Sequence, residues 1–253
     1  ISVRECLTID ELDACVRLQR EAFGLPDLEL TPRRHLIVSR KAGGWTLGAF
    51  LDGRMLGFVL HLVAVRNKDE LIGYSHMMAV AKSAQNMGIG ARLKWAQRER
   101  ALSEKRNFIK WTWDPMQARN AHFNLNRLGV TVSSYGANFY GTDYLTFPHE
   151  QSDAHSLDSD RLFADWDLLS PRVVELAAGR DASVGSPAAE ITIPPDWQML
   201  IKHDPRAARR EQLRVRAEFE QAFAAGLVCA GFKRDEERPR YLLFHESSIA
   251  GGK

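Results

Sequence analysis

Two glycines at a strand-to-helix junction give this sequence its clearest chemical signal. Residues 80–90 read Val-Ala-Lys-Ser-Ala-Gln-Asn-Met-Gly-Ile-Gly and join a β-like run, 71–80, to a helical stretch from Ala91. The first backbone N–H groups of a helix have no partner inside the helix, and the helix dipole adds positive potential there. Gly88 and Gly90 carry no Cβ, so a phosphate can approach the backbone closely. The pattern predicts a pyrophosphate site that needs no cationic side chain.

Two other nucleotide-binding motifs do not fit this junction. The chain has no G-x-x-x-x-G-K-[ST] sequence, so it lacks a Walker-type loop. The third glycine of a dinucleotide-binding fingerprint falls at Leu93. An ordinary tight turn between a strand and a helix stays open as an alternative, which the surrounding elements have to decide.

Apolar periodicity and turn residues predict the elements around the junction. Three antiparallel strands are expected before the loop, at Thr46–Phe50, Met55–Val63 and Leu71–Val80, with turns at Asp52-Gly53 and at 68–70. An edge strand at Val3–Cys6 and a helix over Asp10–Phe23, capped by Thr8 or Asp10, come first. A strand at Phe108–Trp113 and a helix over Gln117–Leu128, stopped by Gly129, come after the loop.

This order of elements, with Gln-x-x-Gly-x-Gly behind a strand that ends in Val, resembles the GNAT N-acetyltransferase superfamily over residues 1–135. The resemblance implies an α/β (α+β) fold, in which helices flank a twisted, mixed, mostly antiparallel sheet. It also implies that the loop binds the pyrophosphate of acetyl-CoA or another acyl-CoA as co-substrate, without a metal. The implied CoA-binding residues are Met78, Ala79, Val80, Gln85, Asn86, Met87, Gly88, Ile89, Gly90, Ala91, Asn120 and Phe123.

Histidine 76 is the candidate general base. It lies four residues before Val80 on the strand that lines the implied cleft, and some arylalkylamine-type relatives carry a His in a similar context. Imidazole titrates near pH 6.5, so it can accept a proton from an ammonium group at neutral pH. A hydrogen-bonded structural His is the alternative. Asp114 is a second candidate base, which can instead bind the acceptor amine or cap the next helix.

The general acid of the family has no counterpart at its usual position. Many relatives carry a Tyr four residues before the glycine that ends the second helix, and here that position is Leu125. Either the CoA thiolate leaves unprotonated, which its low pKa permits, or another residue helps. Tyr135 and Tyr140 are the nearest phenols, and Tyr140 is the candidate acid. The candidate acceptor-binding residues are Trp111, Trp113 and Arg119.

The chain from about residue 148 lies outside the resemblance. The segment 151–159 is polar and predicts a loop, and Arg161–Leu168 predicts a strand that pairs with Val130–Ser134. A short strand at Glu190–Ile193, a helix after Pro194-Pro195-Asp196, an amphipathic helix over Pro205–Ala225 and a final hairpin complete the pattern. We therefore predict a GNAT core over 1–168 and an α+β C-terminal extension over 169–253, for which a degenerate GNAT-like half is an alternative.

Composition favours a soluble globular protein. The 253 residues are 45% hydrophobic, and no apolar run approaches the 18 or so residues that span a bilayer. Three scattered cysteines offer neither metal spacing nor an even disulfide set, which predicts a cytoplasmic location. A net charge of +2 argues against a nucleic-acid partner, and the arginines of 205–225 are interspersed with glutamates.

The sequence thus predicts an N-acyltransferase that moves an acetyl or longer acyl group, such as succinyl, from CoA to the amine of a small molecule or amino acid. The amine would attack the thioester directly in a ternary complex, and a homodimer is compatible with this. A catalytically silent GNAT-like module that senses acyl-CoA is the alternative, since Leu125 replaces the usual Tyr.

Overall fold

The computed structural model describes residues 1–24, 27–142 and 157–250. They form two compact units, 1–111 and 112–253, each with its own internal contacts, and each is described by itself. The predicted division at 168/169 stays a prediction. Residues 151–156 of the predicted polar loop lie outside the described residues.

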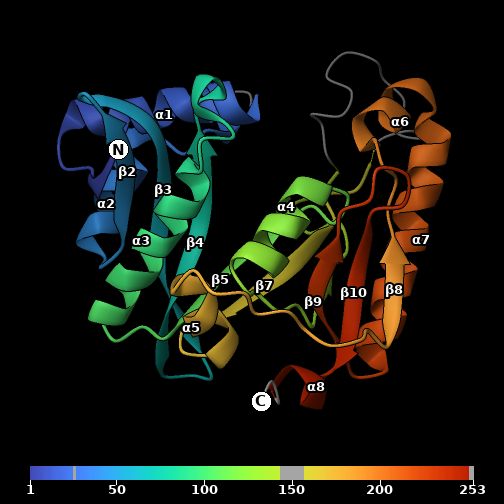
Figure 1. Cartoon of the computed structure of the whole chain (residues 1–253). Helices are drawn as coiled ribbons and strands as arrows, with labels where there is room; N and C mark the ends of the chain where they lie inside the picture. The colour runs from blue at the N-terminus through green and yellow to red at the C-terminus, as the bar shows by residue number, and fades with distance from the viewer. Residues whose placement is uncertain (25–26, 143–156, 251–253) are drawn as a thin grey trace. The chain divides into compact units, whose positions relative to one another are not determined.

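The first unit is built on a mostly antiparallel sheet (Figure 1). Its strands, in spatial order, are β1 (Ser2–Glu5), β2 (Trp45–Leu51), β3 (Arg54–Arg66), β4 (Glu70–Val80) and the first part of β5 (Phe108–Trp113). All neighbours run antiparallel except β4 and β5, which are parallel. The predicted meander is confirmed, and both of its turns contain residues with positive φ, Asp52 and Gly53 in one and Asn67 and Lys68 in the other.

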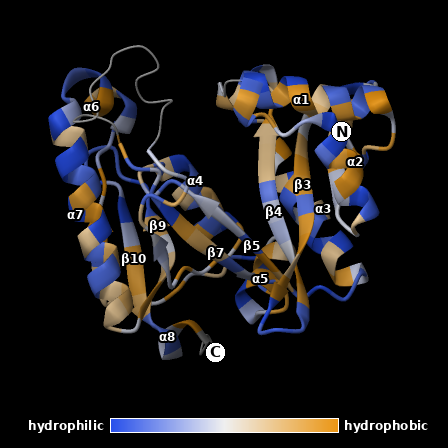
Figure 2. Cartoon of the chain, turned by 180° about the vertical axis from the view of Figure 1, so that it is seen from behind, coloured by the Kyte–Doolittle hydropathy of each residue, from blue (hydrophilic) through white to orange (hydrophobic). Residues whose placement is uncertain are grey.

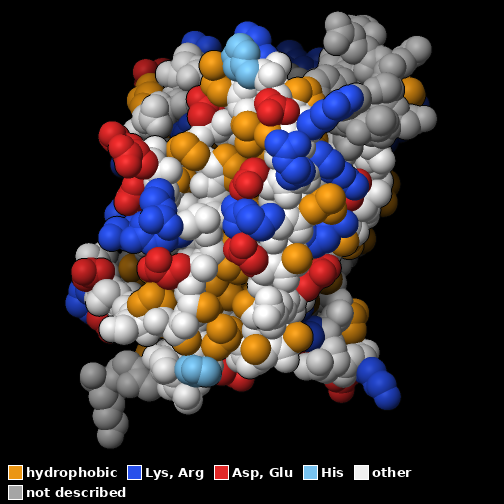
Figure 3. Space-filling model, turned by 90° about the vertical axis from the view of Figure 1, so that its right-hand side faces the viewer, with side chains coloured by type: hydrophobic (Ala, Val, Ile, Leu, Met, Phe, Trp, Pro, Cys, Tyr) orange, Lys and Arg blue, Asp and Glu red, His pale blue; other side chains and the backbone are white. Residues whose placement is uncertain are grey.

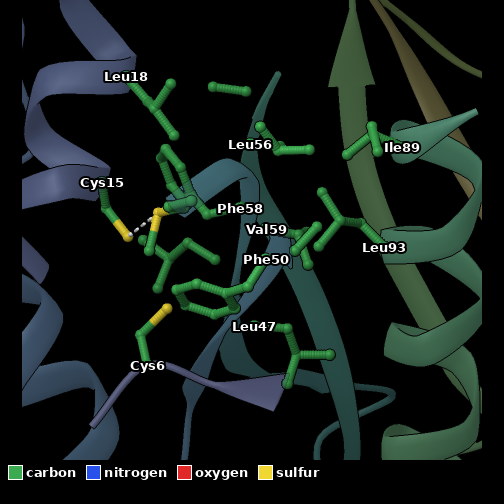
Figure 4. Packing of buried hydrophobic residues seen from close by; sticks show 14 of the residues in the cluster. Cys6, Cys15, Leu18, Leu47, Phe50, Leu56, Phe58, Val59, Ile89 and Leu93 are labelled. Atoms are coloured by element: carbon green, nitrogen blue, oxygen red, sulfur yellow. Dashed lines mark hydrogen bonds between the residues drawn. The ribbon is translucent and has the colours of Figure 1, made fainter. Parts of the chain in front are cut away.

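Helices cover both faces of this sheet. They are α1 (Ile9–Phe23), η1 (Asp27–Glu29), α2 (Arg33–Lys41), η2 (Lys82–Ala84) and α3 (Ile89–Ser103). Figure 4 shows Cys15 and Leu18 of α1 on one side of the core strands and Ile89 and Leu93 of α3 on the other. The predicted mixed sheet flanked by helices is therefore confirmed.

Local signals explain where α1 begins and ends. Thr8 accepts a hydrogen bond from the Glu11 N–H, and the Glu11 carboxylate accepts one from the Thr8 N–H, which makes a capping box. Gly24 ends the helix in the left-handed conformation. The sequence analysis missed α2, which begins directly after Pro32 and carries two arginines in its first turn rather than acidic residues.

The predicted helix over 117–128 is not continuous. Residues Ala118–His122 form α4, and Phe123–Arg127 form one π-helical turn, η3. Gly129, with φ 75°, ends the element as predicted. The π turn adds a residue to the helical turn, and Leu125 and Leu128 are nevertheless fully buried, as is Ala121 before it.

The second unit also contains β6 (Tyr135–Gly136), β7 (Arg161–Asp167) and an antiparallel sheet ordered β8 (Ala189–Thr192), β10 (Arg240–His245), β9 (Leu227–Lys233). Its other helices are α5 (Pro171–Ala177), α6 (Trp197–His203), α7 (Pro205–Ala224) and α8 (Glu246–Ala250). The predicted strand near 190, the amphipathic helix and the final hairpin are confirmed, whereas α5 and α8 were not predicted.

The predicted pairing of Val130–Ser134 with the strand at 161 is only partly correct. The ladder joins Tyr135–Gly136 to Leu162 and Arg161, and Thr131 forms an isolated bridge to Asp165. Val132 forms a further bridge to Cys229 of β9, in which each N–H donates to the other carbonyl. Segment 131–132 is thus bonded to two different strands, which a simple hairpin does not allow.

Helix α7 presents alternating polar and apolar residues (Figure 2). Its arginines are mostly paired with acids: Arg209 with Asp158, Arg214 with Glu211 and Glu218, and Arg216 with Asp158 and Asp160. The face of the molecule in Figure 3 accordingly shows basic and acidic side chains interspersed. Along the described residues, no helix has both the length and the apolar character required to cross a membrane.

Substitution of Gly73 on β4 tests the packing of the sheet. A Cβ added at Gly73 would lie 2.1 Å from Cε1 of His61, a buried ring stacked 4.0 Å from Trp45 that has little room to move. We expect Gly73→Ala to lower the free energy of unfolding by about 1–3 kcal/mol in urea denaturation, as overpacking does. Gly185→Ala, where the added Cβ meets nothing within 4 Å, is the control and should change stability little.

Candidate active site

The glycine loop presents the start of α3 to solvent. Gly88 is the N-cap with φ 74° and ψ 9°, and the helix begins at Ile89, two residues earlier than predicted. The first bond inside the helix runs from the Arg92 N–H to the Gly88 carbonyl, at 3.1 Å. The N–H groups of Ile89, Gly90 and Ala91 therefore have no acceptor within the helix. A Cβ at Gly88 would meet nothing within 4 Å, so no protein atom crowds the backbone at this side of the helix start.

The loop is anchored on its protein side. The Ala81 N–H donates to the Leu56 carbonyl at 2.8 Å, and the Lys82 N–H donates to the Glu21 carboxylate at 2.6 Å. Ile89 is 1% exposed and packs in the core between α3 and the sheet (Figure 4). These contacts hold the loop and fix the direction of the first-turn N–H groups.

Strand β4 carries a β-bulge at His76. Leu60 of β3 pairs with Met77 and the next residue, His61, pairs with Ser75, so His76 has no partner on β3. A bulge bends the strand and re-aims the side chain of the extra residue. His76 is exposed, whereas Ser75 beside it is buried. The sequence gives no signal for this bulge, yet it is what turns the candidate base outward.

A second histidine faces His76. The ring centroid of His35 on α2 lies 6.3 Å from that of His76, and the rings are inclined by 49°. Desolvation by the protein atoms around one side of the ring, and then the proximity of His35, lower the pKa of His76. A lowered pKa keeps His76 neutral at pH 7, which is the form that accepts a proton. The sequence analysis missed His35 because it did not predict α2.

The end of β4 pairs with β3 on one edge. Met78, Ala79 and Val80 face Val59, Phe58 and Gly57 in the antiparallel ladder. On the other edge, β4 and the first unit's part of β5 pair at Gly73–Ile109 and Tyr74–Lys110. No further pair joins them among the residues of that unit, so the backbone of β4 from Ser75 onward is not laddered to residues 108–111.

In the second unit, Asp114 is engaged by its own turn. One carboxylate oxygen accepts from the Met116 N–H at 2.8 Å, and the other accepts from Nε2 of Gln117 at 3.1 Å. These bonds close the turn 114–117, but they are not the helix cap that the sequence analysis named as an alternative, because α4 begins at Ala118 and no side-chain hydrogen bond caps it. The structure thus gives Asp114 a structural function, and its catalytic role stays a prediction.

The two phenols of the second unit have different surroundings. Tyr135 donates to the buried Asp160 carboxylate at 2.7 Å, and burial raises its pKa. Tyr140 is 61% exposed, lies edge-on to Phe139, and has its hydroxyl 3.3 Å from Oγ1 of Thr112. Tyr140 is therefore the more available proton donor of the pair.

The helical segment 118–127 divides its side chains between solvent and core. Arg119 and Asn120 are exposed and Phe123 is half-buried, whereas Asn124 and Leu125 are buried. Asn124 is buried although it lies four residues after the exposed Asn120. Arg172 donates to the Leu125 carbonyl at 2.8 Å, and the inward-facing Leu125 cannot serve as a proton donor.

The two candidate tryptophans are both buried. Trp111 belongs to the first unit and Trp113 to the second, with 6% and 4% of their surfaces exposed. Nε1 of Trp113 donates to the Tyr241 hydroxyl at 3.3 Å. Their contacts with an acceptor remain predictions. Among the described residues, no three His, Cys, Asp or Glu side chains gather in a way that could hold a metal ion.

Comparison with known proteins agrees with this geometry. The acetyltransferase (GNAT) family model matches residues 12–129, which include β4, the glycine loop, α3 and α4. This segment belongs to the GNAT acetyltransferase family. No curated protein matches the sequence.

Solved structures show the GNAT fold at low sequence identity. An N-acetyltransferase from Staphylococcus aureus Mu50 has a TM-score of 0.52 at 13% identity and covers 66% of this chain and 98% of its own. The protein smu.2055 from Streptococcus mutans UA159 has a TM-score of 0.51 at 15% identity, covering 66% and 99%. The ribosomal-protein-S18-alanine N-acetyltransferase of Escherichia coli has a TM-score of 0.50 at 13% identity, covering 65% and 91%.

The pair His35–His76 makes a prediction about titration. We expect the His76 imidazole to titrate below pH 6.5 by NMR, since burial and the proximity of His35 both disfavour its protonated form. His35→Ala removes the second cause, so the midpoint of His76 should rise toward 6.5. Val38→Ala, an uncharged change at an exposed position of α2, is the control and should not move it. If the midpoint of His76 stays unshifted in His35→Ala, His35 does not contribute to the lowered pKa of His76.

Proposed function

We propose that the protein is an acyl-CoA-dependent N-acyltransferase that moves an acetyl or longer acyl group to the amine of a small molecule or amino acid. One observation carries the proposal: the N–H groups of Ile89, Gly90 and Ala91 open α3 directly behind β4, inside the segment that belongs to the GNAT family. The proposed co-substrate fits that backbone, because two adjoining phosphates can accept from successive first-turn N–H groups. Gln85, Asn86 and Met87 form the exposed side of the loop.

The reaction requires one proton transfer from the amine. The amine nitrogen attacks the thioester carbonyl, the C–N bond forms, the C–S bond breaks, and CoA leaves as a thiolate. His76, neutral at pH 7, takes the amine proton directly or through a water molecule. Backbone N–H groups near Met78–Val80 are proposed to stabilise the carbonyl oxygen as it gains charge.

The leaving thiolate does not demand an acid. A thiol has a pKa near 8.5, so the sulfur can depart unprotonated and take a proton from solvent. Tyr140 is the proposed donor if an acid takes part, because its hydroxyl is exposed whereas that of Tyr135 is bound to Asp160. Leu125, fully buried, takes no part.

The acceptor is proposed to be a small amine or amino acid. An amino acid carries a carboxylate, which an arginine recognises well, and Arg119 is exposed on α4. Trp111 and Trp113 are the proposed apolar residues of the acceptor site, and Asn120 and Phe123 the proposed pantetheine contacts. Purified protein incubated with acetyl-CoA or succinyl-CoA and a panel of amines should release free thiol with at least one amine. Binding of CoA without thiol release from any amine would favour the acyl-CoA sensor instead.

Substitution of Gly90 tests the proposed pyrophosphate site at the first turn of α3. Gly90→Glu places a carboxylate in the first turn of α3, where it repels a pyrophosphate and blocks its approach. We expect CoA affinity, measured by calorimetry, to fall at least tenfold, which is about 1.4 kcal/mol. Gly185→Glu introduces the same charge at an exposed glycine of the second unit and should leave CoA binding unchanged. If a folded Gly90→Glu protein binds CoA with unaltered affinity, the first turn of α3 is not the pyrophosphate site.

Substitution of His76 tests the base. We expect His76→Ala to lower kcat by roughly 100-fold and to flatten the acidic limb of the pH–rate profile, while CoA affinity barely changes. His203→Ala removes an exposed histidine of α6 and serves as the control. A kcat within threefold of the wild-type value in His76→Ala would assign the histidine to the structure rather than to the chemistry.

A further inference from the structure

Two aromatic side chains lie exposed next to each other on a turn of the second unit. Phe139 and Tyr140 are the central residues of a four-residue turn, which the Gly141 N–H closes by donating to the Asn138 carbonyl at 3.1 Å. The two rings are 46% and 61% exposed, and their centroids lie 4.7 Å apart in an edge-on arrangement. Removing apolar surface from water is favourable, so two adjacent exposed rings are suited to bind an apolar group.

Buried polar groups hold this turn in one conformation. The Phe139 N–H donates to the Ser159 carbonyl at 3.1 Å, and the Tyr140 N–H donates to Oγ of Ser159 at 2.8 Å. The Asn138 N–H donates to the Asp160 carboxylate at 2.9 Å, and the Asn138 side chain accepts from the Ser159 N–H at 3.2 Å. Ser159 and Asp160 are both buried. The backbone that presents the two rings is therefore ordered in advance, so little conformational freedom is lost when a ligand binds to them.

The polar support of the turn extends to α7 and carries no net charge. The Asp160 carboxylate accepts from the Tyr135 hydroxyl at 2.7 Å and from Arg216 of α7 at 2.7 Å. Asp158 forms ion pairs with Arg209 and Arg216 of the same helix. Two arginines thus balance two carboxylates beneath the turn. A further charge next to the rings is consequently not neutralised by this network.

Arg161 supplies such a charge. Its guanidinium carbon lies 5.1 Å from the centroid of the Tyr140 ring, and its Nη1 donates to the Asp160 carbonyl at 2.8 Å. Along the part of the chain that the structure describes, no carboxylate is paired with Arg161 and its other nitrogens have no acceptor. A single unpaired guanidinium matches a carboxylate, which carries one negative charge and can accept two parallel hydrogen bonds, better than a phosphate ester, which carries up to two charges.

We propose that Phe139, Tyr140 and Arg161 form a binding site for a small ligand that carries an aromatic ring and a carboxylate, such as an aromatic amino acid. The ligand ring packs against the two exposed rings, and its carboxylate accepts from Arg161. The inference does not rest on the proposed function, because the three residues belong to the second unit alone and binding to them requires no CoA.

Four small molecules test the class of ligand when each is titrated into the intact protein without CoA. L-phenylalanine has the ring and the carboxylate, L-alanine lacks the ring, 2-phenylethylamine lacks the carboxylate, and adenosine monophosphate joins an aromatic base to a phosphate. We expect Kd values from NMR titration to be about tenfold lower for L-phenylalanine than for each of the other three. L-phenylalanine should also shift the ring resonances of Phe139 and Tyr140.

Two substitutions test the site, each with a matched control. Phe139→Ala should lower the affinity for L-phenylalanine about tenfold, whereas Phe23→Ala, which removes an exposed ring at the end of α1, should leave it unchanged. Arg161→Met should make L-phenylalanine bind as weakly as 2-phenylethylamine, whose own affinity should change by less than about twofold. Arg210→Met removes an exposed arginine of α7 and should affect neither ligand.

Two further variants separate the ring from its support. Phe139→Leu keeps an apolar side chain without the ring, and its affinity for L-phenylalanine should fall between those of the wild type and Phe139→Ala. Ser159→Ala removes the side-chain acceptor of the Tyr140 N–H and should weaken L-phenylalanine about threefold, although Ser159 does not contact the ligand. Phe139→Leu carries the test if circular dichroism shows that Ser159→Ala does not fold.

The proposal is overturned if L-phenylalanine binds no more tightly than L-alanine, or if a folded Phe139→Ala protein binds it as the wild type does. Tighter binding of adenosine monophosphate than of L-phenylalanine would overturn the assignment of a carboxylate ligand. None of these results depends on acyl transfer. The site can therefore stand if no amine releases thiol from acyl-CoA, and it can fall while the acyltransferase activity is present.

Discussion

The left-handed backbone at Gly88 is the constraint on which the proposed CoA site depends. With φ at 74°, this residue turns the chain from the segment after β4 directly into α3, so that the first-turn N–H groups face outward. Residues with a Cβ seldom adopt that conformation, and glycine adopts it without strain. Behind the turn, Ile89 and Leu93 pack into the core, which fixes the helix axis. Backbone geometry therefore sets the direction of the N–H groups of the proposed site, and the packing of α3 holds them in place.

The two edges of strand β4, which leads into the proposed site, are hydrogen-bonded to different extents. One edge pairs with β3 along almost its whole length, and that ladder is interrupted at His76. The other edge pairs with β5 over two residues of the first unit. A strand bonded fully on both sides would have neither backbone groups for a ligand nor a bulge to turn a histidine outward. Gly73 on this strand has no room for a Cβ, because Cε1 of the buried His61 ring on β3 lies 2.1 Å from that position.

The sequence predicted most of the first unit because its signals there are local. Thr8 with Glu11 specifies a helix cap, and Asp52 with Gly53 specifies a turn, and each pair lies close together in the sequence. The features it could not predict depend on residues distant in sequence. The bulge at His76 reflects the register of β4 on β3, and the approach of His35 requires α2 to fold over that strand. Gly73 is a local signal for the buried ring of His61, since an isolated glycine in a strand suggests a close approach by another group.

The C-terminal third is an integral part of the second unit, because it is hydrogen-bonded to residues 113–132. The Tyr241 hydroxyl, fully buried on β10, donates to the Pro115 carbonyl at 2.7 Å and accepts from Trp113, on either side of Asp114. Asn126 of the π turn pairs with both backbone groups of Phe232, and Val132 bridges to Cys229. A buried donor or acceptor left without its partner costs about 1–3 kcal/mol, so loss of the final hairpin would destabilise residues 113–132 directly. The segment outside the family match is therefore a structural support for residues inside it, and its sequence is constrained by them.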